Sequence, residues 1–330
     1  MVDIVNGSRS DEVIAGTIVL TVGITGISLN IAAILLIYRT PSLHNAFGFI
    51  CSSHLLSNIG LLVVFSFWTA PMLLIGCSES ITQSYIGQRM GQLVVLFWFA
   101  TIYGHLQIAL NRLVAIISPL LYSSTFTRIR TIQILVIFWF ISFMQVAGQF
   151  FKGCTFTFHV DSFLWSYATT DCGYNLAFYL AFLHGTIFGV IVVMIDTTAF
   201  FAILKKAKKM AKTLGEVREA SILKYNIRLY AMGCTQAFCF IWTILCFHFL
   251  PLMLTTKWSR FATLTVGWEL VHAVDGLILI VFHEKFRVLL CHPSLPWRKN
   301  AVLTVATTRS RFLFATEDPH RERPRRIAHF

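Results

Sequence analysis

The stretch of sequence that decides the fold is residues 91–122, GQLVVLFWFATIYGHLQIALNRLVAIISPLLY. Residues 91–110 contain no Lys, Arg, Asp or Glu, and a helix of that length spans about 30 Å, the thickness of the hydrocarbon core of a bilayer. Arg112 follows where such a helix would reach the membrane surface, a place where an uncompensated arginine is costly. The stretch therefore predicts a membrane-spanning helix that ends at an arginine with a functional role.

The rest of the chain has the composition of a membrane protein. Its 330 residues are 56% hydrophobic and 13% charged, with a mean hydropathy of +0.70, which is more apolar than a soluble domain. Apolar runs long enough to cross a bilayer recur along the chain, and they predict an all-α fold, a bundle of seven transmembrane helices. The predicted spans are residues 13–38, 46–75, 91–110, 132–151, 175–204, 229–254 and 261–281.

Positive charges are distributed unevenly between the two sets of loops. Of the 27 lysines and arginines, 22 fall on the side of the C-terminus and 5 on the opposite side, and cytoplasmic loops carry the excess. We therefore expect a multi-pass protein of the plasma membrane with its C-terminus in the cytoplasm and its N-terminus outside, where the sequon at Asn6 would be glycosylated. This sorting also accounts for the net charge of +12, so no nucleic-acid partner is expected.

The two ends of the chain differ from the apolar middle. Residues 1–12 are polar and are expected to form an extracellular N-terminus. Residues 284–291 mix apolar and basic side chains at helical spacing, which predicts a short amphipathic helix on the membrane surface, with Cys291 as a candidate for palmitoylation. We expect a transmembrane domain over residues 13–291 and a basic, disordered cytoplasmic tail over residues 292–330.

Three of the eight cysteines fall on the outer side, where the environment is oxidising: Cys77, Cys154 and Cys172. Cys154 and Cys172 bracket the loop between the fourth and fifth spans. A disulfide between them would hold a flap of about 20 residues over the outer mouth of the bundle. We expect this pairing, and a bridge from Cys77 to either of the two is the alternative.

Polar side chains inside the apolar runs must face the interior of the bundle. Asn30, Asn58 and Asp275 come from the first, second and seventh spans at similar depth, and a shared cluster would satisfy all three. His272, one turn from Asp275, is assigned to the same network. The network is interpreted either as a set of contacts that hold helices together or as a hydrated switch that couples a ligand to the cytoplasmic face.

Glu269, His272 and Asp275 recur at intervals of three residues, which places them on one side of the seventh helix. Neither the HExxH spacing nor a partner cluster is evident, so we expect no metal and no cofactor. Glu269 lies about 12 Å below the outer end by helical rise, the depth of a ligand pocket. It is a candidate ligand contact, with a structural ion pair or a hydrogen-bonded neutral carboxyl as alternatives.

Other buried aromatic and histidine side chains are weaker pocket candidates, because ordinary packing explains any single one of them. These candidates are His105, Tyr103, His184 and Trp268.

The residues named so far carry a resemblance to a known superfamily. Asn30, Asn58, Arg112 with Pro119-Leu120, and Trp139 stand at the spacings of rhodopsin-like G-protein-coupled receptors. Three departures point to a narrower group: Asn111 replaces the usual acid before the arginine, the proline-containing signature of the sixth span is missing, and Asp275 stands where an Asn-Pro pair is expected.

That narrower group is the nematode serpentine receptor class X chemoreceptors. Residues 13–290 resemble them, and four motifs occur in the right order. The motifs are NAFGFICSSHLLSN (45–58), GHLQIALNRLVAIISPLLYS (104–123), the loop of Cys154 and Cys172 with Trp165, and GWELVHAVDGLI (267–278).

The resemblance implies a chemosensory receptor rather than an enzyme. Such a receptor would sit in sensory-neuron cilia, bind a small external odorant or pheromone and activate a heterotrimeric G protein. Membrane lipid and a second receptor copy are the further partners that this class implies. A multi-pass transporter or channel is the alternative, although the inverted repeat typical of transporters is not seen.

The resemblance also assigns a G-protein coupling switch to Asn111, Arg112, Pro119 and Leu120. Because Asn111 is not an acid, we hypothesise that the resting lock on Arg112 is weak, and that Asn111→Asp would lower ligand-free signalling.

Overall fold

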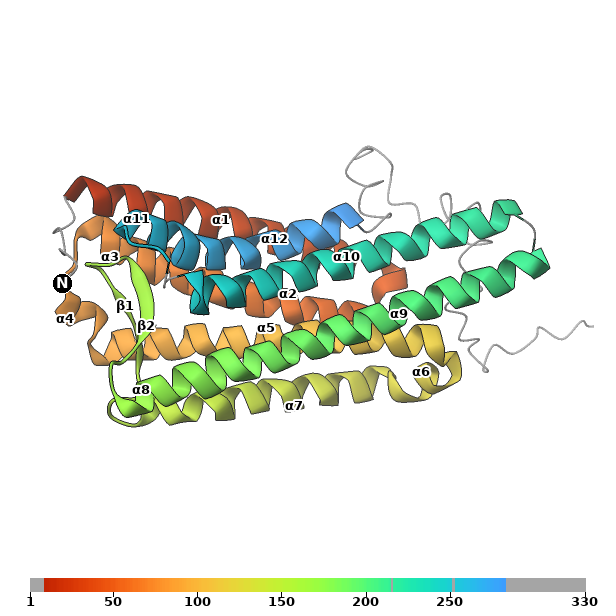
Figure 1. The fold of residues 1–330 in the computed structure, drawn as a ribbon, viewed down its shortest axis with the longest axis horizontal. Helices are drawn as coiled ribbons and strands as arrows, with labels where there is room; N and C mark the ends of the chain where they lie inside the picture. The colour runs from red at the N-terminus through yellow and green to blue at the C-terminus, as the bar shows by residue number, and fades with distance from the viewer. Residues whose placement is uncertain (1–8, 215, 251–252, 283–330) are drawn as a thin grey trace, which may run out of the picture.

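The computed structural model describes residues 9–214, 216–250 and 253–282, and it consists almost entirely of long helices that run side by side (Figure 1). In this part of the chain, seven helices are long and apolar enough to cross a membrane. The predicted all-α seven-helix bundle is therefore confirmed.

The spans are single or composite helices. The first is α1 (Arg9–Arg39), the third is α5 (Tyr85–Ile117) and the sixth is α10 (Glu216–His248). The others join α-helices to short π-helical or 3-10 segments: α2 (Ala46–Val64) with η2 (Phe65–Thr69) and α3 (Ala70–Ile75); α7 (Arg128–Val146) with η3 (Ala147–Phe150); α8 (Asp171–Asn175) with η4 (Leu176–Leu183) and α9 (His184–Leu214); α11 (Lys257–Arg260) with η6 (Phe261–Val266) and α12 (Gly267–Phe282). Short helices between the spans are η1 (Pro41–Leu43), α4 (Glu79–Thr82) and α6 (Pro119–Thr125).

Each predicted span falls on one of these helices, but the predicted ends were inexact. Helix α5 continues to Ile117 instead of ending near residue 110, because charged side chains end an apolar run without breaking the backbone pattern of a helix. Helix α10 ends at His248 rather than residue 254. Pro251 follows in the sequence, and a proline disfavours the helical conformation in the residue before it.

Local side chains fix several helix starts. Asn45, Ser84 and Thr127 each accept a hydrogen bond from the backbone N–H three residues ahead and so cap α2, α5 and α7. At the other end of the second span, Gly76 takes a left-handed φ of 74°, which a glycine adopts without the strain of a side chain.

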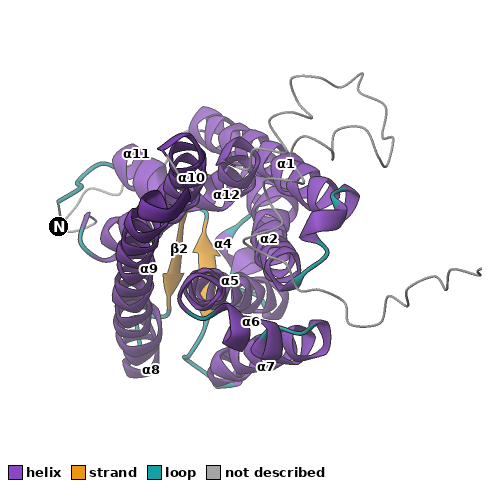
Figure 2. Ribbon diagram, turned by 90° about the vertical axis from the view of Figure 1, so that its right-hand side faces the viewer, coloured by secondary structure: helices purple, strands orange, loops and turns teal. Residues whose placement is uncertain are grey.

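A β-hairpin, which the sequence did not predict, fills the end of the bundle that is predicted to be extracellular, called the outer end below. Strands β1 (Phe156–His159) and β2 (Leu164–Tyr167) pair antiparallel, with Phe158 opposite Trp165, and they lie among the helices when the bundle is viewed along its length (Figure 2). Trp165 packs on Phe65 of η2, and Phe156 packs on Trp268 of α12. The expected flap is therefore folded and buried rather than an open loop.

Helix α5 forms the centre of the bundle and α7 its edge. In the apolar stretch of α5, 72% of the residues are buried, against 17% in α7. Apolar clusters fill the outer half, around Phe65, Phe99 and Trp268, and the inner half, around Ile50 and Ile278. The polar side chains described next come from the helices that surround α5 and from α5 itself.

Candidate functional site

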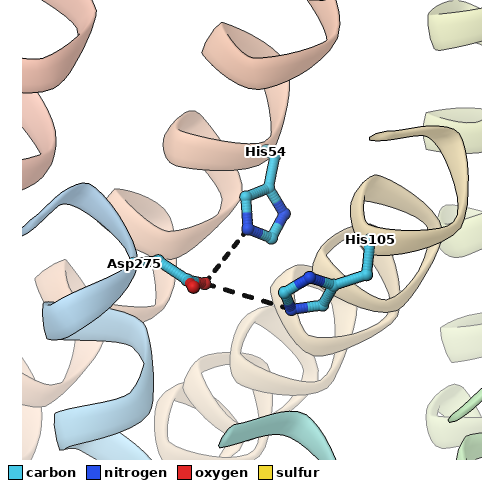
Figure 3. Close-up of side chains that lie close together, drawn as sticks. All are labelled: His54, His105 and Asp275. Atoms are coloured by element: carbon cyan, nitrogen blue, oxygen red, sulfur yellow. Dashed lines mark hydrogen bonds and ion pairs between the residues drawn. The ribbon is translucent and has the colours of Figure 1, made fainter. Parts of the chain in front are cut away.

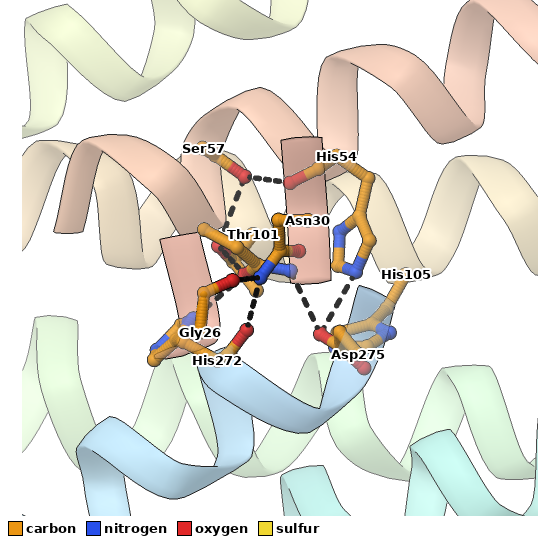
Figure 4. Close-up of polar contacts among 9 residues, drawn as sticks. Gly26, Asn30, His54, Ser57, Thr101, His105, His272 and Asp275 are labelled. Carbon is orange, nitrogen blue, oxygen red and sulfur yellow. Dashed lines mark hydrogen bonds and ion pairs between the residues drawn. The ribbon is translucent and has the colours of Figure 1, made fainter. Parts of the chain in front are cut away.

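A buried polar cluster in the interior of the bundle joins α1, α2, α5 and α12 (Figure 4). Asn58 Nδ2 donates to Asp275 Oδ2 at 3.0 Å, and the Asn58 Oδ1 lies 2.7 Å from Nδ1 of His272. Asn30 Nδ2 donates to the carbonyl oxygens of Gly26 at 2.8 Å and of His272 at 3.0 Å. The structure thus brings the predicted network residues together, but it links Asn30 to them through the backbone of α12.

The cluster is larger than the sequence indicated. The hydroxyls of Ser57 and Thr101 lie 3.0 Å apart, and Thr101 donates to Asn58 Oδ1 at 3.2 Å. His54 Nε2 contacts Asp275 Oδ2 at 3.0 Å. The signal for His54 was present, because it precedes Asn58 by four residues and so shares its helix face; Thr101 had no signal beyond being a polar residue in an apolar run.

His105 belongs to this cluster and not to an outer pocket. Its Nε2 lies 4.0 Å from Asp275 Oδ2, and its ring lies 4.4 Å from the ring of His54 between centroids. Among the described residues, His54, His105 and Asp275 form a group that could hold a metal ion (Figure 3). The expectation of no metal site rested on the absence of the HExxH spacing and of a partner cluster on another helix, whereas the structure brings His54 and His105 from two other helices to Asp275.

The remaining pocket candidates divide into two groups. Glu269 is fully buried, and neither of its carboxylate oxygens has a hydrogen-bond partner within the described part of the chain. Its neighbour Trp268 packs against Trp98 and Phe65, with ring centroids 5.8 and 5.6 Å apart. Glu269 and Trp268 thus lie in the outer aromatic core, close to the hairpin.

Tyr103 and His184 form the second group. The Tyr103 hydroxyl lies 3.1 Å from His184 Nε2, which also contacts Gln145 Nε2 of α7 at 3.2 Å. The two predicted pocket residues therefore join α5 to α9 and α7.

Arg112, the predicted switch residue, has an acidic partner that the sequence did not reveal. Its Nη2 lies 3.6 Å from Oδ1 of Asp196 on α9, and its Nε donates to the carbonyl of Ile108 at 3.4 Å. Both charged side chains are largely buried. The acid that is absent at position 111 is thus supplied by the fifth span, and the hypothesis of a weak resting lock on Arg112 stays a prediction.

Helix α10 closes over this ion pair at Gly233. A Cβ atom at this position would press on Nη1 of Arg112 and would also approach Oδ2 of Asp196. The absence of a side chain at Gly233 therefore lets the sixth span pack directly on the pair that joins the third and fifth spans.

The other predicted switch residues lie on α6, except for Asn111, which lies on α5. Asn111 is buried. Burial raises the pKa of Tyr122 on α6, and a side-chain hydrogen bond with Asn111 acts in the opposite direction. Pro119 occupies the first turn of α6, where its missing N–H costs nothing. Leu120 is 87% exposed at the surface, so it is free to contact another molecule.

On the outer side, Cys154 and Cys172 form a disulfide whose Cα atoms are 5.1 Å apart, and Cys77 is a free thiol. The glycosylation candidate Asn6, the amphipathic helix with Cys291, and the cytoplasmic tail lie outside the described residues.

Comparisons with known proteins agree with this architecture. A family model described as "Serpentine type 7TM GPCR chemoreceptor Srx" matches residues 20–283. The Caenorhabditis elegans protein "Serpentine receptor class X 45" is 24% identical over 94% of this chain and 90% of its own length. A second protein of that organism, "Serpentine receptor class X-43", is 22% identical over 90% of this chain and 93% of its own.

The fold has a counterpart of known structure. The crystal structure of squid rhodopsin superposes with a TM-score of 0.72 at 19% identity, covering 96% of this chain and 94% of the rhodopsin chain. Since the family model matches most of the chain, this multi-pass membrane protein belongs to the Srx family of serpentine seven-transmembrane G-protein-coupled chemoreceptors.

Proposed function

We propose that this receptor binds a small external molecule in the outer half of its bundle and activates a heterotrimeric G protein at its inner end. The observation that carries the proposal is the Arg112–Asp196 pair, which joins the third and fifth spans beneath the sixth at the end of the bundle assigned to the cytoplasm. An ion pair between helices is an element that can be closed or open, as a switch requires.

The outer half has the features of a ligand site. The hairpin is anchored by the Cys154–Cys172 disulfide, and it packs on aromatic side chains that reach Trp268 next to Glu269. A ligand that enters here would exchange contacts with the hairpin and with the outer part of α12. The same helix carries Asp275 farther inward, so a shift of α12 is transmitted to the polar cluster.

The polar cluster would carry the shift across the bundle. Asn58 bonds both to Asp275 and to His272 on α12, and also to Thr101 on α5. A buried polar group that loses its partner costs about 1–3 kcal/mol, so α12 cannot move without a matching rearrangement of α2 and α5. Movement at the outer end therefore reaches the helix that bears Arg112.

At the inner end, activation would separate α10 from α5. Gly233 would leave Arg112, and the Arg112–Asp196 pair would open to a helix of the G protein. The exposed Leu120 on α6 offers an apolar contact beside this opening. With its N-terminus outside, the receptor would act in the plasma membrane of sensory cilia, as the resemblance implies.

The direct test is nucleotide exchange on a co-expressed G protein during a screen of small molecules. The proposal expects at least one compound to accelerate exchange in cells that express the chain and not in cells that lack it. A compound that is carried across the membrane by the chain without any exchange would instead favour a transporter.

A further inference from the structure

Three side chains with metal-binding atoms converge in the interior of the bundle, from α2, α5 and α12. His54, His105 and Asp275 each offer one ligand atom, and these atoms all lie within 4.8 Å of one another. Figure 3 shows both imidazole rings directed at the same carboxylate. The three residues are 2%, 4% and 1% exposed, so bulk water does not compete for their atoms.

The spacing of these atoms suits one small ion better than it suits hydrogen bonds alone. His105 Nε2 is 4.0 Å from Asp275 Oδ2, beyond hydrogen-bond distance, while His54 Nε2 is 3.0 Å from the same oxygen. A tetrahedral zinc ion with bonds of about 2.0–2.1 Å holds its ligand atoms about 3.3–3.4 Å apart. The two distances lie on either side of that value.

The surroundings support the same interpretation. Asn58 Nδ2 donates to Asp275 Oδ2 at 3.0 Å, the kind of outer hydrogen bond that orients a carboxylate ligand. Gly104 of α5 leaves room for the His54 ring, since a Cβ atom there would meet it. Oδ1 of Asp275 is buried without a hydrogen-bond partner among the described residues, so this carboxylate has an oxygen available to coordinate an ion.

The geometry points to a binding site for a divalent ion of the zinc class, held by His54, His105 and Asp275 and joining α2, α5 and α12. Two neutral imidazoles and one carboxylate are a ligand set that suits zinc, and they leave one tetrahedral position for a water or for the second carboxylate oxygen. The ion would hold the three helices in the closed arrangement described here. Binding of the ion needs neither the odorant nor the G protein, so a test of this site is independent of the proposed function.

The test uses the full-length chain, purified without a polyhistidine tag and stripped with a chelator. Titration with Co²⁺ is expected to give the visible absorption of a four-coordinate ion that saturates at about one ion per chain, and Zn²⁺ is expected to displace it. Bound Zn²⁺ should also raise the Tm of the chain, because the ion binds the folded state.

Variants locate the ion. His54→Gln and His105→Gln should each weaken Co²⁺ binding at least about 100-fold, since losing even an outer-shell partner costs 10–100-fold. His159→Gln is the matched control, because His159 also faces a carboxylate, Glu79 at 3.4 Å, but on the outer surface. This variant should bind as the wild type does.

Three results would overturn the inference: no stoichiometric uptake of Co²⁺ by the wild type, unchanged binding in His54→Gln and His105→Gln, or loss of binding in His159→Gln alone. If His54→Gln and His105→Gln fail to fold, X-ray absorption of the zinc-loaded wild type identifies the ligands of the ion instead. Scattering from two imidazole rings at about 2.0–2.1 Å supports the site, and a spectrum without it rejects the site.

Discussion

The polar cluster in the middle of the bundle and the Arg112–Asp196 pair at its inner end both join helices through buried polar groups, yet they are built differently. Within the cluster, Asn58 alone bonds to three partners on two other helices. At the inner end, Arg112 Nη2 on α5 lies 3.6 Å from Asp196 Oδ1 on α9. We assign transmission to the cluster, whose bonds are shared among several helices, and switching to the ion pair, which joins two helices where the sixth span packs on them at Gly233.

The largest expected effect comes from breaking the cluster. Asp275→Ala removes the acceptor shared by Asn58 and His54, and each buried donor left without a partner costs about 1–3 kcal/mol. Thermal unfolding of the purified receptor should show a large fall in Tm. Asp161→Ala, at an exposed position of the hairpin turn, is the control, and an equal fall in both variants would contradict the assignment.

The inner pair should respond in activity more than in stability. Asp196→Asn removes the charge that faces Arg112, and a loss of about 1.4 kcal/mol would raise the population of the open state about tenfold. Ligand-free nucleotide exchange should rise accordingly.

The control for this variant is Asp171→Asn, which removes an exposed carboxylate from the first turn of α8, at the outer end of the same span. Basal exchange that stays at the wild-type level in Asp196→Asn would show that the pair does not hold the resting state.

A smaller loss of stability should follow when one hydroxyl is removed from the cluster and the carboxylate of Asp275 is kept. Thr101→Val keeps the volume of the side chain but removes the hydroxyl that donates to Asn58 and contacts Ser57. We expect a loss of about 1 kcal/mol in stability, measured by the same thermal unfolding. A loss as large as that of Asp275→Ala would mean that the hydroxyl, and not the carboxylate, organises the cluster.

The smallest effect is expected at Asn111. Because Asp196 already faces Arg112, an added acid in Asn111→Asp should lower ligand-free exchange less than Asp196→Asn raises it. A change in exchange of equal or larger size would show that the neighbouring position, and not the fifth span, controls the arginine.

The fold and part of the site were predictable from the sequence, because apolar length and helical spacing are local properties. The same reasoning placed Asn30, Asn58 and Asp275 at one depth, where Asn58 bonds to Asp275 and Asn30 joins them through the backbone of His272. Boundaries such as the end of α5 were less predictable, because a helix continues past the hydrocarbon whenever its backbone pattern is undisturbed.

The partners of the key residues were not predictable, because they depend on how helices pack. Asp196 reaches Arg112 only because α9 lies against α5, and His54 reaches His105 and Asp275 only because α2, α5 and α12 converge. The hairpin was missed for a related reason: its alternating aromatic residues form strands because the bundle offers them a buried surface.

The most direct test of the account is the distance between labels on the cytoplasmic ends of α5 and α10, compared in the wild type and Asp196→Asn without ligand. The account predicts that the variant gains a population with a longer distance, because α10 packs at Gly233 on the Arg112–Asp196 pair and loses this support when the pair opens. Identical distance distributions in the two proteins would contradict the claim that the Arg112–Asp196 pair keeps the receptor closed.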